Sequence, residues 1–332
     1  MPLDASTSDT SARPRTGRRR RLAAVGAAFC VLAAVAATGV ALKHQERARA
    51  ELLAPGDAAG GRWSADAERG DGVADEVRAG LKGEGTTDTS APTRPEVADL
   101  AKAAPSPLPA SDPLAAAPTG PRPTIGPLFY AGVPGGPDHQ CTAAVVHSPR
   151  GNLLVTAAHC VYQGGFRTDL AFVPGYHDGL MPYGVWVPTR IDLDPRWTAD
   201  RDPDHDVAFV QVRRPGAGKA RIESTTAAEQ IRFNPPPSRP TRLVGYPYDQ
   251  ERPISCQNAT NPFSPTQLSL ICPGFPSGTS GGPMLTDLDP NTGRGTVTGV
   301  LGGYDEGGDD TTSYSTYFGD DVAGLYRRAT TA

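Results

Sequence analysis

The sequence predicts an all-β fold, either a barrel or a sandwich, for the part of the chain that begins at about Ile125. Short runs of β-branched and aliphatic residues follow one another there, and turn signals such as residues 149–152 and 291–293 lie between some of them. Helical periodicity is missing until residues 321–328, which predict one short C-terminal helix. Many short strands separated by turns are typical of barrels and sandwiches. The predicted strands are 142–146, 153–156, 170–173, 185–187, 207–212, 242–244, 268–272 and 296–301.

The composition agrees with this fold and gives no reason to propose nucleic acid as a partner. Among 332 residues, Gly (38) and Pro (34) are both frequent, as expected for a chain with many turns or long linkers. The formal net charge of -4 is small for this length. Outside the N-terminus the sequence has no zinc-finger spacing and no basic stripe, which are the usual signs of nucleic-acid binding.

The N-terminus predicts export. Residues 1–21 are polar and end in four arginines, and residues 22–42 form an uncharged apolar run. A membrane-spanning helix needs about 20 apolar residues, so this run predicts a transmembrane anchor with residues 1–21 as a cytoplasmic tail. A cleaved export signal is the alternative, because residues 37–41 are small, although such signals usually have shorter apolar cores. Either interpretation places the rest of the chain on the extracellular face of the cytoplasmic membrane or in the medium.

Residues 43–124 predict a disordered linker rich in Ala, Pro and Gly. Trp63 is their only aromatic residue, so the segment has little apolar surface with which to offset the entropy lost on ordering. Proline recurs every few residues from 103 to 127, which is typical of an extended spacer.

Five cysteines are present, and four of them lie in the predicted β-rich part. Cys30 belongs to the apolar N-terminal run, whereas the others are Cys141, Cys160, Cys256 and Cys272. Four cysteines allow three pairings, and the sequence alone does not choose among them. Export would favour their oxidation to disulfides.

Three motifs that carry chemistry follow one another in the β-rich part. They are Leu-Val-Thr-Ala-Ala-His-Cys at residues 154–160, Asp-Val-Ala-Phe-Val at 206–210 and Gly-Thr-Ser-Gly-Gly-Pro at 278–283. A serine hydroxyl is a poor nucleophile at neutral pH and needs an adjacent base. His159 could accept the proton of Ser280, and Asp206 could orient the imidazole and stabilise its cation.

The order of these residues separates the candidate folds. A Gly-x-Ser-x-Gly sequence also occurs in α/β-hydrolases, but there the histidine follows the serine. No histidine follows Ser280 in this chain. Subtilisin-like enzymes have the aspartate before the histidine, so only a His–Asp–Ser order fits the whole set.

Together the three motifs resemble those of the chymotrypsin-like serine proteases, and most closely those of the bacterial branch that includes the glutamyl endopeptidases. The resemblance covers about residues 125–328 and assigns residues 125–332 to a protease domain. It implies two packed antiparallel six-stranded β-barrels, the first at about residues 125–225 and the second at about residues 240–320. The active site would lie in the cleft between them, and neither a cofactor nor a metal ion is implied.

The resemblance also implies roles for individual residues. The backbone N–H groups of Gly278 and Ser280 would form the oxyanion hole. His139, two residues before Cys141, matches a histidine near the family's active site, and it either lies behind the catalytic residues or is exposed to solvent. The implied disulfides are Cys141–Cys160 and Cys256–Cys272.

Departures from the family pattern leave activation and specificity open. Thr279 stands where chymotrypsin has an aspartate that captures a freed N-terminus, so activation by that ion pair is not expected. Gly274 stands where trypsin-like enzymes have an aspartate, and the strand after the nucleophile lacks the histidine of glutamyl endopeptidases. Residues 300–304 should form one wall of the pocket. The acidic residues that follow are expected to be a solvated loop, with a preference for basic substrates as the alternative: Asp305, Glu306, Asp309 and Asp310.

The sequence therefore predicts an exported, monomeric serine endopeptidase that acts on protein or peptide substrates through an acyl-enzyme. Its catalytic residues would be His159, Asp206 and Ser280, and its contact with the membrane would be the N-terminal helix. A catalytically silent, surface-tethered binding module on the same fold is the alternative function.

Overall fold

A computed structural model describes residues 52–81, 108–133 and 137–331 of the chain. The chain divides into two units, Met1–Glu51 and Leu52–Ala332, and all described residues belong to the second. The predicted cytoplasmic tail and the membrane or signal segment lie outside the described residues. Within the described ranges, no helix is long and apolar enough to cross a membrane.

The first of two β-sheets contains the predicted histidine and aspartate motifs. Its seven strands lie in the order β2-β9-β10-β6-β5-β4-β8, and every neighbouring pair is antiparallel. A separate two-stranded ribbon pairs β1 (Leu53–Ala54) with β7 (Phe166–Arg167). The strands of the first sheet are β2 (Arg62–Ser64), β4 (Ile125–Tyr130), β5 (Asp138–Val146), β6 (Leu153–Thr156), β8 (Leu170–Phe172), β9 (Val187–Leu193) and β10 (Ala208–Arg213).

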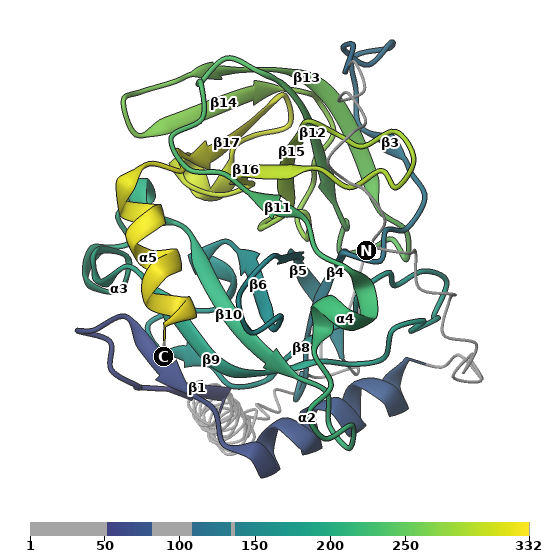
Figure 1. The fold of residues 1–332 in the computed structure, drawn as a ribbon, viewed down its shortest axis with the longest axis vertical. Coiled ribbons are helices and arrows are strands. Elements are labelled where there is room, and N and C mark those ends of the chain that lie inside the picture. The colour runs from purple at the N-terminus through teal and green to yellow at the C-terminus, as the bar shows by residue number, and fades with distance from the viewer. Residues whose placement is uncertain (1–51, 82–107, 134–136, 332) are drawn as a thin grey trace, which may run out of the picture. The chain divides into compact units, whose positions relative to one another are not determined.

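The second sheet contains the predicted nucleophile motif and lies above the first in Figure 1. Its order is β11-β16-β15-β12-β13-β14-β17, with β3 added beside β13. All of these pairs are antiparallel except β11 with β16. The strands are β3 (Ala117–Pro118), β11 (Gln230–Ile231), β12 (Pro240–Gly245), β13 (Ile254–Pro262), β14 (Gln267–Ile271), β15 (Pro283–Thr286), β16 (Thr296–Val300) and β17 (Thr312–Thr316).

The two sheets differ from the predicted pair of six-stranded barrels in strand number, being seven- and eight-stranded. The additional strands include β2 and β3, which come from the segment expected to be a linker. Neither β13 nor β17 was predicted, because polar residues dominate their sequences and no apolar run marks them.

The predicted C-terminal helix is present as α5 (Asp320–Thr330) and packs beside β9 and β10. Its first turn is acidic and its last turn contains Arg327 and Arg328, which complements the helix dipole. The remaining helical elements are α2 (Ala67–Gly80), α3 (Pro195–Asp200), α4 (Ile222–Thr226) and the short 3₁₀ turns η1 (Ala158–Cys160), η2 (Pro203–His205) and η3 (Tyr304–Gly307).

The prediction of a disordered linker is wrong for residues 52–81. Strand β2 extends the edge of the first sheet beside β9, and Arg62 donates from Nε to Asp192 at 2.8 Å. Asp66 caps helix α2, which buries Val73, Ala74 and Val77 in the same apolar cluster as residues of the first sheet. The segment orders because the existing sheet supplies the apolar surface that the segment itself lacks.

The same prediction is wrong for residues 108–124, which run along the second sheet. Strand β3 pairs with β13, and the N–H of Ala116 donates to the carbonyl of Pro273 at 2.7 Å. Ser111 exchanges two hydrogen bonds with Gln257. A proline-rich chain is accommodated here because it lies at a sheet edge, where few of its N–H groups are needed. Residues 82–107 of the predicted linker lie outside the described part.

Helix α2 should contribute measurably to stability. We expect Val77→Ala, at a position with no solvent exposure, to lower the free energy of unfolding by about 1.5–3 kcal/mol through lost burial and a residual cavity. Denaturant unfolding would measure this, with the exposed Asp75→Ala on the same helix as control. Equal unfolding free energies for the two variants would mean that α2 does not pack against the core of the first sheet.

Candidate active site

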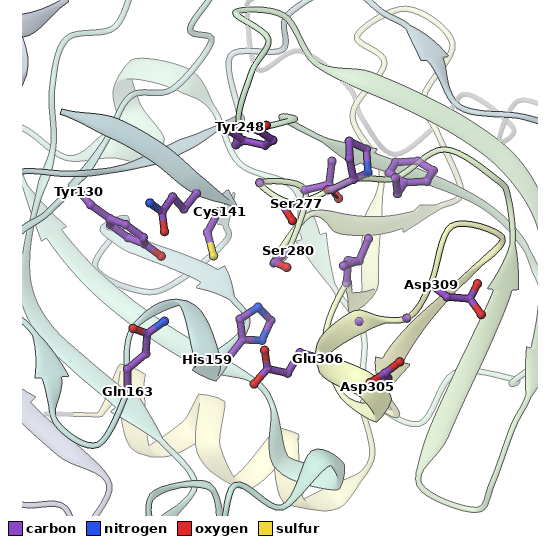
Figure 2. A pocket seen from close by; sticks show the side chains of 18 of the residues that line it. Tyr130, Cys141, His159, Gln163, Tyr248, Ser277, Ser280, Asp305, Glu306 and Asp309 are labelled. Atoms are coloured by element: carbon purple, nitrogen blue, oxygen red, sulfur yellow. Dashed lines mark hydrogen bonds between the residues drawn. The ribbon is translucent and has the colours of Figure 1, made fainter. Parts of the chain in front are cut away.

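The fold brings His159 and Ser280 to the lining of one cavity and places Asp206, which is buried, against His159. His159 lies in η1, directly after β6, and Asp206 follows η2, directly before β10. Because β6 and β10 are antiparallel neighbours, both side chains are at the same end of the first sheet. Ser280 lies in the turn between β14 and β15 of the second sheet and is adjacent to His159 (Figure 2).

A buried carboxylate orients the histidine. Asp206 has no solvent exposure, and its Oδ2 accepts a hydrogen bond from His159 Nδ1 at 2.7 Å. Backbone N–H groups of His159 and Gly303 donate to Oδ1 at 2.9 Å and to Oδ2 at 2.8 Å. Burial alone would raise the pKa of Asp206. The imidazole of His159 and these N–H donors have the larger opposite effect, so the pKa lies below its ordinary value. The ionised acceptor assigns the proton to Nδ1, which leaves Nε2 as the free base.

The candidate nucleophile is accessible and close to that base. Ser280 is partly exposed, and its side chain lies next to the imidazole of His159 in Figure 2. Among the described contacts, no hydrogen bond joins the Ser280 hydroxyl to His159. In substrate-free enzymes such catalytic hydrogen bonds are often long and shorten when substrate binds.

Two backbone N–H groups beside the nucleophile are available to an oxyanion. The N–H groups of Gly278 and Ser280 donate to no acceptor among the described residues. The carbonyl of Ser277 accepts from the N–H of Tyr248 at 2.9 Å, which fixes the opposite end of the peptide that carries the Gly278 N–H. Gly278 has φ +95°, and a Cβ there would lie 2.3 Å from the Tyr248 nitrogen. Only glycine fits this position.

Three solved structures with a similar fold are named as proteases. Protease Anisep from Arthrobacter nicotinovorans has a TM-score of 0.57 and 23% identity, covering 65% of this chain and all of its own. The thermostable serine protease AL20 from an extremophilic microorganism has a TM-score of 0.55 and 26% identity, covering 63% of this chain and 98% of its own. A Glu endopeptidase has a TM-score of 0.52 and 16% identity, and the match covers 66% of this chain and 97% of the endopeptidase. The chain is similar in fold to the chymotrypsin-like serine proteases. Its likeness to the glutamyl-endopeptidase branch is confirmed at the level of the fold.

Sequence comparisons add less than the structures do. No protein-family profile matches the protease. An extracellular metalloprotease of Bacillus subtilis (strain 168) is 25% identical over 154 residues, which is 46% of this chain but only 38% of that protein's length. In the described part, the group with metal-ligand spacing is Cys141, His159 and Cys160. Its two sulfur atoms are bonded to each other, so neither is a free thiolate ligand.

Both predicted disulfides of the protease are present. Cys141–Cys160 joins β5 to the turn that carries His159, and Cys256–Cys272 joins β13 to the segment just after β14. The first bridge is buried and includes Cys160, the residue next to His159, so it restrains the backbone that carries the base.

The cavity beside Ser280 has a volume of about 650 Å³ and an acidic wall. The four acidic residues of the loop are exposed to solvent, as expected, and Asp305, Glu306 and Asp309 also line this cavity, whereas Asp310 does not. In Figure 2, Glu306 lies beside His159, with Asp305 and Asp309 on the same side. No lysine or arginine is among the lining residues, although Arg201 lies 3.8 Å from Glu306 outside the lining, so the wall presents mainly negative charge to the cavity.

His139 is a core residue and not an exposed one. It is 5% exposed and has edge-on ring contacts with Phe129, Tyr176 and Tyr246. Burial lowers its pKa, and its Nδ1 has no hydrogen-bond partner among the described residues. It does not line the cavity, which supports the position behind the catalytic residues that the resemblance implied.

Two contributors to the site were not predicted from the sequence. Gly303 supplies an N–H to Asp206, and Thr142 makes contacts with the nucleophile turn that are described below. Both act across long sequence separations, so no local motif indicates them.

The acidic wall should shift the pH profile. Burial lowers the pKa of His159, but the Asp206 charge and hydrogen bond, together with Glu306, raise it above its ordinary value despite Arg201. A general base must be neutral, so activity should fall as the pH drops through this raised pKa. We expect Glu306→Gln to lower that pKa and to move the acid limb of kcat/KM down by about 0.2–0.7 pH units, as for an exposed charge pair.

The measurement is kcat/KM against pH, with Glu68→Gln on the distant surface of α2 as the control. An acid limb that is unmoved in Glu306→Gln, or moved equally in both variants, would show that Glu306 does not act on His159.

Proposed function

We propose that this protein is an exported serine endopeptidase that hydrolyses peptide bonds through an acyl-enzyme. The observation that carries the proposal is the His159–Asp206 hydrogen bond, which lies beside Ser280 and two unoccupied backbone donors in one cavity. Each of these groups has a defined task in acyl transfer.

The residues support the following sequence of steps. Ser280 Oγ attacks the carbonyl carbon of the substrate while His159 Nε2 takes the hydroxyl proton, and Asp206 stabilises the imidazolium. The oxyanion of the tetrahedral intermediate accepts hydrogen bonds from the N–H groups of Gly278 and Ser280, each worth about 3–4 kcal/mol in the barrier. The C–N bond then breaks, and His159 gives the proton to the leaving amine. Water, deprotonated by His159, hydrolyses the ester and releases Ser280.

Export is supported by the two disulfides, which persist in oxidising compartments. The Bacillus subtilis relative is named as extracellular. We propose that residues 22–42 act as a membrane anchor or a cleaved signal, which leaves the protease domain outside the cytoplasm. One chain supplies the entire proposed active site, so we propose a monomer.

A fluorophosphonate tests the proposed nucleophile. The wild-type protein should gain one covalent adduct, which peptide mapping should locate on Ser280, because activation by His159 distinguishes this hydroxyl from all others. Ser280→Ala should gain none. A folded wild-type protein that is not modified, or an adduct on another residue, would remove the proposed mechanism.

A silent binding module on the same fold is the second candidate, because no hydrogen bond joins Ser280 to His159 among the described contacts. Digestion of casein or of a peptide library by wild type and Ser280→Ala separates the two functions. Cleavage by wild type alone supports the enzyme, whereas equal results for both proteins leave only the binding module.

The acidic wall predicts a preference for a positively charged substrate side chain near the scissile bond. The side-chain carboxylate of Asp305 has no hydrogen-bond or ion-pair partner among the described residues and is exposed, so its charge is available to substrate. We expect Asp305→Asn to lower the ratio of kcat/KM for lysine over leucine peptides about two- to fivefold. Asp310→Asn, in the same loop but outside the cavity, is the matched control. An unchanged kcat/KM ratio in Asp305→Asn would show that the carboxylate of Asp305 does not select the substrate side chain.

A further inference from the structure

Thr142 belongs to the first sheet, but several of its hydrogen bonds lead to the second. It lies in β5, has no solvent exposure and directly follows the disulfide-bonded Cys141. Its carbonyl accepts from the hydroxyl of Thr156 at 2.8 Å within the first sheet. Its hydroxyl and its N–H, by contrast, bind segments of the second sheet.

The hydroxyl of Thr142 bridges two backbone groups that flank the candidate oxyanion hole. It accepts a hydrogen bond from the N–H of Tyr246 at 2.9 Å and donates one to the carbonyl of Gly278 at 3.0 Å. The N–H of Thr142 donates to the carbonyl of Ser280 at 2.7 Å. Both residues that present a free N–H to the cavity therefore have their carbonyls held by Thr142.

These contacts add to the backbone hydrogen bonds that hold the nucleophile turn, residues 277–281, in which the N–H of Gly281 donates to the carbonyl of Leu301 at 2.6 Å and the N–H of Thr279 donates to the carbonyl of Pro276 at 3.2 Å. Gly278 and Gly281 both have positive φ and no side chain to pack. Carbonyl groups of the turn are restrained as well, and Thr142 holds two of them, those of Gly278 and Ser280. The hydroxyl also holds Tyr246, two residues before the N–H that fixes the carbonyl of Ser277.

The hydrogen bonds that Thr142 makes to the turn involve no charged group, and Thr279, the residue beside the nucleophile, is uncharged as well. Thr279 is buried, and its hydroxyl donates to the carbonyl of Pro276 at 2.6 Å, so no ion pair is required within the turn. The conformation of the turn thus depends on hydrogen bonds within the chain and does not require a new N-terminus released by cleavage.

We propose that Thr142 is a positioning residue, which holds the turn of residues 277–281 so that the N–H groups of Gly278 and Ser280 point at the developing oxyanion. The inference rests on the proposed serine endopeptidase function. Thr142 touches neither the substrate nor the reacting atoms. It acts on the carbonyls of Gly278 and Ser280, each of which lies in the peptide that directly follows one of the two N–H donors. The uncleaved chain would therefore already contain a formed oxyanion hole.

The test compares Thr142→Val, which removes the hydroxyl at nearly constant shape, with Thr142→Ser, which keeps it. We expect Thr142→Val to lower kcat about 10- to 100-fold with KM changed less than about threefold, because a misdirected donor weakens transition-state binding more than substrate binding. Thr142→Ser should retain kcat within about threefold. A peptide aldehyde, which forms a tetrahedral adduct, should lose affinity for Thr142→Val by about the same factor as kcat/KM.

The control is Thr226→Val in α4. Thr226 is also buried, and its hydroxyl also donates to backbone carbonyls, but it does not line the cavity. We expect this variant to lose thermal stability without losing kcat or aldehyde affinity. Should Thr142→Val fail to fold, Thr142→Ala removes the same hydroxyl without a β-branched replacement and should show the same pattern.

Several results would overturn the inference. Wild-type kcat in a folded Thr142→Val, or an equal loss in Thr142→Ser, would mean that the hydroxyl does not position the turn. A loss in KM alone would assign Thr142 to substrate binding instead. These outcomes leave the proposed function intact, whereas a wild-type protein that neither cleaves peptides nor reacts with a fluorophosphonate defeats both.

Discussion

The burial of one charged carboxylate is the constraint on which the site depends. Asp206 is removed from water, and an uncompensated charge there would be strongly unfavourable. Three hydrogen bonds compensate it, two from His159 and one from Gly303. The histidine belongs to the first sheet, whereas the glycine follows β16 of the second. The carboxylate therefore favours the arrangement in which both sheets contribute to the same cavity.

Other contacts between the sheets follow the same principle of satisfying buried polar groups. Thr142 does so with an uncharged hydroxyl and an N–H at the nucleophile turn. Glu229, also without solvent exposure, accepts hydrogen bonds from the hydroxyl of Thr124 and the N–H of Gly295. Its own N–H donates to Val145 of the first sheet. Since buried polar groups are costly when unpaired, these contacts restrict how the sheets can pack.

Parts of the segment that precedes residue 125, which the sequence predicted to be a disordered linker, are ordered against the two sheets. Residues 52–81 cover an edge of the first sheet, and residues 108–124 pair with the second. An edge strand with free N–H and C=O groups invites unwanted pairing, and a covering segment removes that hazard. The pairing of residues 116–118 also supports the segment of Pro273 and Gly274, which leads into the nucleophile turn.

The sequence was most informative where a function is encoded locally. His159 and Ser280 sit in contiguous motifs, and the order of the motifs excluded the competing folds, so the site could be predicted without coordinates. Helix α2 could not, because its few apolar residues become useful only against an existing sheet. The acidic wall of the cavity includes left-handed conformations at Asp305 and Glu306, which sequence patterns do not indicate.

Thr142 shows a third kind of limit. It is 136 residues from Gly278, its hydrogen-bond acceptor, and nothing in the sequence of β5 distinguishes it from an ordinary strand threonine. A role that depends on a long-range hydrogen bond becomes visible only when the two sheets are placed together.

The most direct test of the central claim is a crystal structure of the fluorophosphonate adduct. The account predicts that the phosphorus atom is bonded to Ser280 Oγ, with one phosphoryl oxygen about 2.7–3.1 Å from the nitrogens of both Gly278 and Ser280. His159 should lie between the adduct and Asp206. An adduct whose phosphoryl oxygen points into solvent, with His159 turned away from Asp206, would contradict it.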